Sequence, residues 1–269
     1  MVSSVENNLA VFCDFENVAL GVRDAKYAKF DINKILERLL VKGSIVVKKA
    51  YCDWDRYKTF KATMHEAAFE LIDIPHVRQS GKNSADIRMV VDALDLCYTK
   101  SHVNMFVVIS GDSDFSPLVS KLRENAKTVI GVGVKNSTSD LLINNCDEFI
   151  YYDDLIREQV QKRSTRKATP SGAVKRKKKT GAKPKDQMQE GIDLALETAD
   201  ALNAERGDQE KLWGSMVKQA LKRRRPGFNE SYYGFQSFSK LLEEAQSRGQ
   251  VDLELDDRSG GYIIRDVVH

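Results

Sequence analysis

The stretch Ser110-Gly111-Asp112-Ser113-Asp114-Phe115 places two carboxylates between an apolar run and a helical pattern. The run before it, residues 105–109 (MFVVI), is typical of a buried strand. Pro117, just after it, suits the first turn of a helix, where its missing N–H is tolerated. The two acids therefore lie in a strand-to-helix turn. In an open parallel sheet, that edge is where ligands collect.

A second acidic turn has the same setting. Residues 9–13 (LAVFC) form a predicted strand, and Asp14-Phe15-Glu16-Asn17 follows it directly. A further acid, Asp86, stands at the head of a helical pattern that continues through residues 87–94. If strands 9–13 and 105–110 are neighbours, these acids converge. Acids at two strand ends then indicate a shared metal site rather than scattered surface charge.

Strand and helix signals alternate through the first 156 residues. The expected strands are 9–13, 44–51, 71–78, 105–110, 127–133 and 147–151, and the expected helices are 31–41, 55–70, 84–99, 114–125 and 138–145. Asp31, Ser84 and Asp140 are candidate N-caps. Such alternation predicts the α/β class, with a parallel sheet covered by helices on both faces. Residues 1–156 are therefore expected to form one three-layer domain.

The formal net charge of +3 comes from one short segment. Residues 157–185 hold 12 basic and 1 acidic residue and almost nothing apolar, which predicts a disordered basic linker. The flanking parts carry net charges of −3 and −5. The linker is either a solvated tether or a segment that attracts phosphates without sequence preference.

Residues 186–269 are expected to form a second, smaller domain. Three amphipathic patterns begin near Gln187, Leu212 and Phe235, and two alternating runs flank the turn 256–260. Three helices followed by a β-hairpin are typical of a winged helix-turn-helix. Its candidate RNA-binding residues combine cations with aromatic rings: Arg223, Arg224, Arg225, Tyr232 and Tyr233. The alternative is a core aromatic set beside a solvated basic helix end.

Cysteine usage and hydropathy indicate a reducing, cytoplasmic location. The four cysteines form no CxxC pair and lie in or beside apolar elements, which favours buried free thiols over disulfides or zinc. No run approaches the length of a membrane span, and the first residues lack the pattern of a signal peptide.

The four acids Asp14, Asp86, Asp112 and Asp114 are the candidate catalytic and metal-ligating residues. Two unit charges about 4 Å apart repel by roughly 4 kcal/mol at an effective dielectric of 20, so a shared pocket calls for a cation. Mg²⁺ or Mn²⁺ suits all-oxygen ligands and can activate water against a phosphodiester.

Three further residues could support these acids. Asn17 could orient a carboxylate or the attacking water, Ser110 could hydrogen-bond a ligand, and Lys82 could bind substrate phosphate. Each acid also has an alternative, structural interpretation. Asp14 could simply end a strand, Asp112 or Asp114 could cap a helix, and Asp86 could be a first-turn acid.

The chain resembles the NYN domain family (LabA-like, within the PIN-like nuclease superfamily). The matching segments are residues 12–17, 50–54, 81–86 with 91–94, and 110–115. The resemblance implies a metal-dependent ribonuclease fold with Mg²⁺ or Mn²⁺ held by Asp14, Asp112 and Asp114, Asp86 as the fourth acid, and Asn17 in support. PIN relatives often have Glu where Asp86 stands.

Residues 190–265 are similar to the LOTUS (OST-HTH) domain. The similarity rests on residues 226–242 and on the hairpin that ends at 261–265. It implies a winged helix that binds RNA or docks a protein partner.

Together these features predict a metal-dependent endoribonuclease whose linker and C-terminal domain deliver RNA. A non-catalytic RNA-binding adaptor on the same fold is the main alternative. A phosphatase or nucleotide-binding α/β protein is a third, although the turn after residues 9–13 has neither a glycine-rich phosphate loop nor an Asp-x-Asp nucleophile motif. A homodimer remains open.

Overall fold

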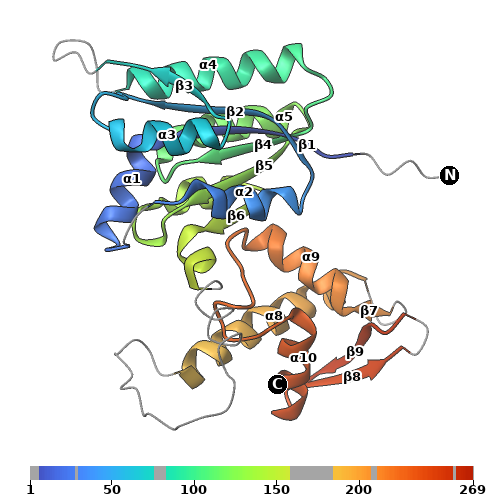
Figure 1. Cartoon of the computed structure of the whole chain (residues 1–269). Helices are drawn as coiled ribbons and strands as arrows, with labels where there is room; N and C mark the ends of the chain where they lie inside the picture. Colours follow the sequence, from blue (N-terminus) through green and yellow to red (C-terminus); the bar gives the residue numbers. More distant parts are fainter. Residues whose placement is uncertain are drawn as a thin grey trace, which may run out of the picture. The chain divides into compact units, whose positions relative to one another are not determined.

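The structure, a computed structural model, describes residues 6–27, 30–75, 83–157, 184–206, 211–256 and 259–268. The chain divides into two compact units, residues 1–157 and 158–269, which are described separately (Figure 1). Lys82 and residues 158–183 of the predicted linker lie outside the described residues.

The first unit is built on a six-stranded parallel sheet with the order β3-β2-β1-β4-β5-β6. The strands are β1 (Asn8–Asp14), β2 (Ser44–Cys52), β3 (Glu70–Asp73), β4 (Met105–Ile109), β5 (Thr128–Gly133) and β6 (Glu148–Tyr151). The predicted α/β class with a parallel sheet is confirmed. The expected neighbours β1 and β4 pair directly, with Cys13 opposite Ile109.

Alternate residues of β1 supply the two faces of this sheet. Leu9, Val11 and Cys13 enter one apolar cluster, and Ala10 and Phe12 enter the other. Such alternation follows from the two-residue period of a strand, and it requires cover on both faces. The three-layer prediction therefore holds.

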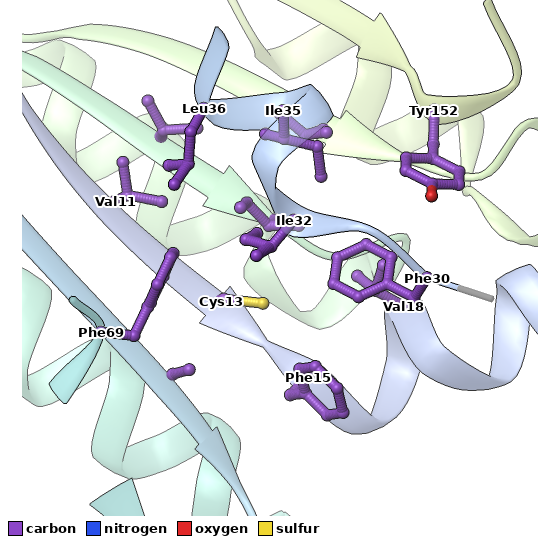
Figure 2. Packing of buried hydrophobic residues seen from close by; sticks show 14 of the residues in the cluster. Val11, Cys13, Phe15, Val18, Phe30, Ile32, Ile35, Leu36, Phe69 and Tyr152 are labelled. Carbon is purple, nitrogen blue, oxygen red and sulfur yellow. The ribbon is translucent and has the colours of Figure 1, made fainter. Parts of the chain in front are cut away.

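Two successive groups of helices in the first unit cover the two faces of the sheet. The first cluster takes residues from α1 (Phe15–Asp24), α2 (Ile32–Leu40) and α3 (Lys58–Glu66). The second takes residues from α4 (Ser84–Thr99), α5 (Ser116–Glu124) and α6 (Asp140–Asn145). Figure 2 shows the first cluster, in which Phe15 and Phe30 lie beneath α2. Burying one such aromatic side chain contributes about 1.5–3 kcal/mol.

Two predicted elements are shorter in the structure. The strand predicted at 71–78 is β3, which ends at Asp73, level with the end of its partner β2 at Cys52; residues 76–78 of this prediction lie outside the described residues. The helix predicted at 55–70 is α3, which ends at Glu66. Ala68 then adopts a positive φ of 56°, outside the helical region.

Of the three predicted N-caps, one is confirmed, although the predicted bounds of the helix 84–99 match α4. Asp31 caps α2 by accepting from the Asn33 amide. Ser84 and Asp140 are the first residues of α4 and α6, so the predicted caps are wrong. The caps are their predecessors Asn83 and Ser139. Helix α1 was not predicted, because its apolar positions directly follow a strand without a break.

The second unit has the element order helix–strand–helix–helix–strand–strand. Its elements are α8 (Pro184–Arg206), β7 (Leu212–Trp213), α9 (Gly214–Arg224), α10 (Phe238–Ser247), β8 (Val251–Leu255) and β9 (Tyr262–Val267). The strands form an antiparallel sheet with the order β7-β9-β8. The strand β7 is an addition to the prediction. Helix α8 begins at Pro184, two residues before the predicted start of the second domain at residue 186.

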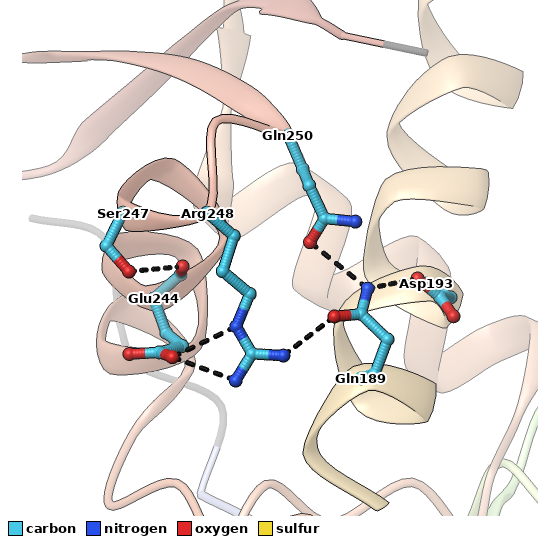
Figure 3. Close-up of polar contacts among 6 residues, drawn as sticks. All are labelled: Gln189, Asp193, Glu244, Ser247, Arg248 and Gln250. Atoms are coloured by element: carbon cyan, nitrogen blue, oxygen red, sulfur yellow. Dashed lines mark hydrogen bonds and ion pairs between the residues drawn. The ribbon is translucent and has the colours of Figure 1, made fainter. Parts of the chain in front are cut away.

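A polar network joins α8 to α10 (Figure 3). Arg248 donates to Glu244 on α10 and, at 2.7 Å, to the side-chain oxygen of Gln189 on α8. Gln189 in turn donates to Asp193 and Gln250. These contacts fix the two helices above the shared apolar core of the unit.

All four cysteines are free and buried, which confirms the predicted reduced thiols. In the described parts of the chain, none of the helices has both the length and the apolar character needed to cross a bilayer.

Candidate active site

The candidate acids gather where the strand order reverses. From β1 the chain proceeds to β2 on one side, and it later enters β4 on the other side. The carboxyl ends of two such strands leave a crevice between their outgoing loops, and ligands bind there in open α/β sheets. Asp14 ends β1, and Ser110 and Asp112 follow β4.

Asp14 is the buried centre of this group, with 8% of its surface exposed. It also caps α1, because its Oδ1 accepts from the Asn17 amide at 3.3 Å. Its Oδ2 accepts from the Ser110 hydroxyl at 2.9 Å. Both carboxylate oxygens are therefore held by the protein, which fixes the side chain at the mouth of the crevice.

Asn17 ties the two acidic turns together. Its Oδ1 accepts from the backbone amide of Gly111 at 2.9 Å. This oxygen therefore positions the second turn, while the backbone amide of Asn17 holds the Asp14 carboxylate. A Cβ at Gly111 would lie 2.3 Å from the carbonyl oxygen of Ser137, so glycine permits this close approach.

Ser110 links Asp14 to the second turn, which is the supporting contact that the sequence suggested. Its Oγ donates to Asp14 and accepts from the Asp112 amide at 3.2 Å. Asp112 caps the short helix η1 (Ser113–Phe115), where its Oδ1 accepts from the Asp114 amide at 3.0 Å. Asp114 is exposed.

Asp86 joins the group from the first turn of α4. Burial raises its pKa, and the nearby charges of Asp112, Asp114 and Glu16 raise it further. Burial and the charges of Asp86 and Asp112 raise the pKa of Asp14 to about 7, although the hydrogen bonds from Asn17 and Ser110 oppose the shift. The four predicted acids therefore share one electrostatic environment.

Glu16 is a member of this group that the sequence interpretation did not select. It lies in the first turn of α1 and forms an ion pair with Arg56 at 2.9 Å. Its position two residues after Asp14, in the same acidic turn, was the available signal. Because Arg56 balances its charge, Glu16 adds less negative potential than the other acids.

The remaining four acids differ from Glu16 in their ion pairing. Within the described residues, no basic side chain forms an ion pair with Asp14, Asp86, Asp112 or Asp114. Buried carboxylates without a countercharge are costly, and all-oxygen donors of this kind suit a hard divalent cation. The donor chemistry therefore fits Mg²⁺ or Mn²⁺.

The acids are nevertheless not arranged as a ready ligand set. Among the residues that the structure describes, no group of three or more His, Cys, Asp or Glu side chains is close enough to hold a metal ion. Asp14 and Asp112 are instead turned to Ser110 and to backbone amides, as the structural alternative anticipated. Helix capping accounts for these contacts but not for the concentration of charge.

The candidate RNA-binding residues of the second unit divide into two kinds. Arg223 and Arg225 are exposed at the end of α9, and Arg224 forms an ion pair with Glu197 at 2.7 Å. Tyr233 is stacked on Phe228, with ring centroids 5.2 Å apart, and packs against the core of the unit. The core-aromatic alternative thus describes Tyr233, whose ring is not free to stack on a base.

Two known proteins are similar to part of this chain. The chain is 27% identical over 166 residues to uncharacterized protein MJ0482 of Methanocaldococcus jannaschii, which covers 60% of this chain and 63% of that protein. The chain thus spans less than two thirds of this relative. It is also similar to the crystal structure of VPA0982, a protein of unknown function from Vibrio parahaemolyticus, with a TM-score of 0.51 and 28% identity over 58% of this chain and 98% of that one.

A family model settles the classification. Residues 8–154, which contain the whole six-stranded sheet and all four acids, match the model of the NYN domain, a family whose members are generally nucleases. The chain belongs to the NYN domain family.

Proposed function

We propose that the protein is a metal-dependent endoribonuclease that hydrolyses RNA phosphodiester bonds at the crevice between β1 and β4. The observation that carries the proposal is the set of four carboxylates without ion-pair partners in the described chain, centred on the buried Asp14. Helix capping explains the placement of Asp14 and Asp112, but it does not explain why four carboxylates lie together, because like charges in a partly buried site repel.

The side chains of the site have distinct tasks in this proposal. Asp14, Asp112, Asp114 and Asp86 would hold Mg²⁺ or Mn²⁺, which when bound supplies the positive charge that activates water and balances the phosphodiester. Ser110 holds Asp14, and Asn17 holds the turn that carries Asp112. Partners of this kind orient ligands and are commonly needed for full activity.

The second unit is proposed to bring RNA to the site. Its helix–strand–helix–helix–strand–strand order supports the winged-helix assignment and the similarity to the LOTUS domain. Arg223 and Arg225, exposed at the end of α9, would contact phosphates. A protein partner that docks on this unit is compatible with the same fold.

One observation favours the alternative, a non-catalytic RNA-binding adaptor. No three of the described acids are placed so that they could ligate one metal ion together. An adaptor would retain RNA and give no metal-dependent product.

The deciding experiment compares the purified protein with its Asp112→Asn variant on mixed structured and single-stranded RNA in Mn²⁺, in Mg²⁺ and in EDTA. Cleavage that needs metal and is lost in the variant, with RNA affinity nearly unchanged, is the expected result. Equal loss of cleavage and affinity in a folded variant would refute the catalytic assignment. RNA retention without product in either metal would establish the adaptor.

A further inference from the structure

A groove with a volume of about 690 Å³ lies directly beside the acids. Asp86 and Asp114 line both the groove and the acidic site, so the two are continuous. Its other walls come from α4, from the start of α5 and from α6. A volume of this size is typical of sites for small molecules or for parts of larger ligands.

The groove is mainly apolar and open to solvent. Ile87 and Val91, one turn apart on α4, are 63% and 55% exposed, and Leu141 of α6 is 57% exposed. Large aliphatic side chains so exposed and so close together usually mark a surface that binds something. The acids at one end of the groove make an acidic ligand without a cation unfavourable there.

Ser116 adds a polar group to the groove wall. The residue is 6% exposed, and its hydroxyl has no hydrogen-bond partner among the described residues. It is the first residue of α5, a helix whose cap makes no side-chain hydrogen bond. A buried hydroxyl left unpaired costs about 1–3 kcal/mol, and a ligand could reach this oxygen only if the wall of the groove shifts.

We infer that the groove takes one unpaired nucleobase of the RNA, next to the phosphate that is cleaved; this rests on the proposed ribonuclease function. A base is flat and largely apolar on its faces, which suits the exposed aliphatic side chains of Ile87, Val91 and Leu141. Seating it between α4 and α5 brings the adjoining phosphate to Asp86 and Asp114. The preferred substrate is therefore single-stranded, or has an unstacked base at the cut.

A second copy of the chain fits the groove less well. In a two-fold dimer this patch would face itself, so that Asp86 and Asp114 of both copies would approach one another. Like charges so placed repel.

Single-stranded RNA in which one abasic position is moved along the strand tests this inference. Binding is measured in the Asp112→Asn background, where cleavage is not expected, so the test is separate from the cleavage assay of the wild-type protein. Loss of the base that contacts these aliphatic side chains is expected to weaken binding about tenfold at one position, adjacent to the site of cleavage. Adding Ile87→Ser should reduce that penalty to about twofold or less, because the contact is already missing.

Tyr98→Ser is the matched control. Tyr98 lies on the same helix and is 64% exposed, but it does not line the groove, so the tenfold penalty should persist in this variant. The same abasic penalty with and without Ile87→Ser would overturn the inference, as would the absence of any position-dependent penalty. A dimer that Ile87→Ser dissociates would overturn it as well, by assigning the surface to a second copy. If the wild-type protein does not cleave RNA but the abasic penalty is observed, the proposed nuclease function is refuted and the inference of a base-binding groove is supported.

Discussion

The acidic crevice of the first unit and the aromatic-basic cluster of the second attract attention in the sequence for the same reason, because each concentrates polar chemistry in a short stretch. In the structure they differ. The acids Asp14 and Asp86 carry charge that packing does not explain, whereas Tyr233 packs in the core and Arg224 has an ion-pair partner. A cluster of polar residues is therefore more informative about function when its side chains are not already engaged in ion pairs or in packing within the fold.

The largest effect should follow the loss of one acid. Asp86→Asn is expected to lower metal-dependent cleavage by at least about a hundredfold, beyond the range typical of residues that only support ligands. Asp95→Asn is the matched control, because Asp95 lies on the same helix, is exposed and is outside the acid group. Initial rates on one RNA, with folding checked by circular dichroism, give the answer. Equal cleavage rates for the two variants would show that Asp86 does not take part in the reaction.

The next effect concerns the residue that joins the two acidic turns. Ser110→Ala removes the hydroxyl between Asp14 and the Asp112 amide, and we expect cleavage or metal affinity to fall by about ten- to a hundredfold. Cleavage titrated with Mn²⁺ separates the two quantities. Ser44→Ala, at an exposed position far along the chain, should leave both unchanged. A Ser110→Ala protein with wild-type titration would show that Asp14 needs no such support.

Removing the charge of Asp14 should stabilise the metal-free protein at high pH. The pKa of Asp14 is about 7 in the folded state, above its ordinary value, so the folded state holds the proton more tightly and stability falls as the pH rises between these values. In EDTA, the gain from Asp14→Asn in the free energy of unfolding should be larger at pH 8 than at pH 5 by about 1–3 kcal/mol. Urea denaturation at the two pH values measures it. A gain that is independent of pH would mean that the carboxylate is well solvated.

The smallest effect probes the second unit. Tyr233→Ala should lower the free energy of unfolding of this unit by about 1–2 kcal/mol, because its ring contacts Phe228 and α8 at Gly191. Tyr232→Ala, outside the described core cluster, should cost less. Thermal unfolding and RNA affinity are measured on both variants. Loss of affinity without loss of stability in Tyr233→Ala would restore the ring to an RNA-binding surface.

The fold could be predicted largely because its signals are local. Alternating apolar runs gave the strands, and the two faces of β1 follow from the same pattern. The incorrect N-caps and the incorrect strand end occur where an adjacent residue or a paired strand determines the boundary of the element. Asn83 and Ser139, rather than Ser84 and Asp140, precede the helices, because adjacent residues qualify equally as caps in the sequence. β3 stops where β2 stops, which its own sequence does not encode.

The candidate site was predictable in its acids and not in its surroundings. Asp14, Asp112 and Asp114 follow strands, so their meeting depends only on which strands pair. The groove depends on side chains from three helices. Ile87 and Val91 are exposed because other elements leave them uncovered, and their own sequence does not determine this. Helical periodicity alone would place both residues in a core.

The hydrogen bond from the Gly111 amide to Asn17 also has a consequence for solution measurements. This amide comes just after the end of β4, yet its acceptor is a side chain of α1 rather than a neighbouring strand. Its hydrogen–deuterium exchange rate therefore reports whether α1 is docked, independently of the sheet. One amide signal can thus reveal whether the acids of both turns are held together before any substrate is present.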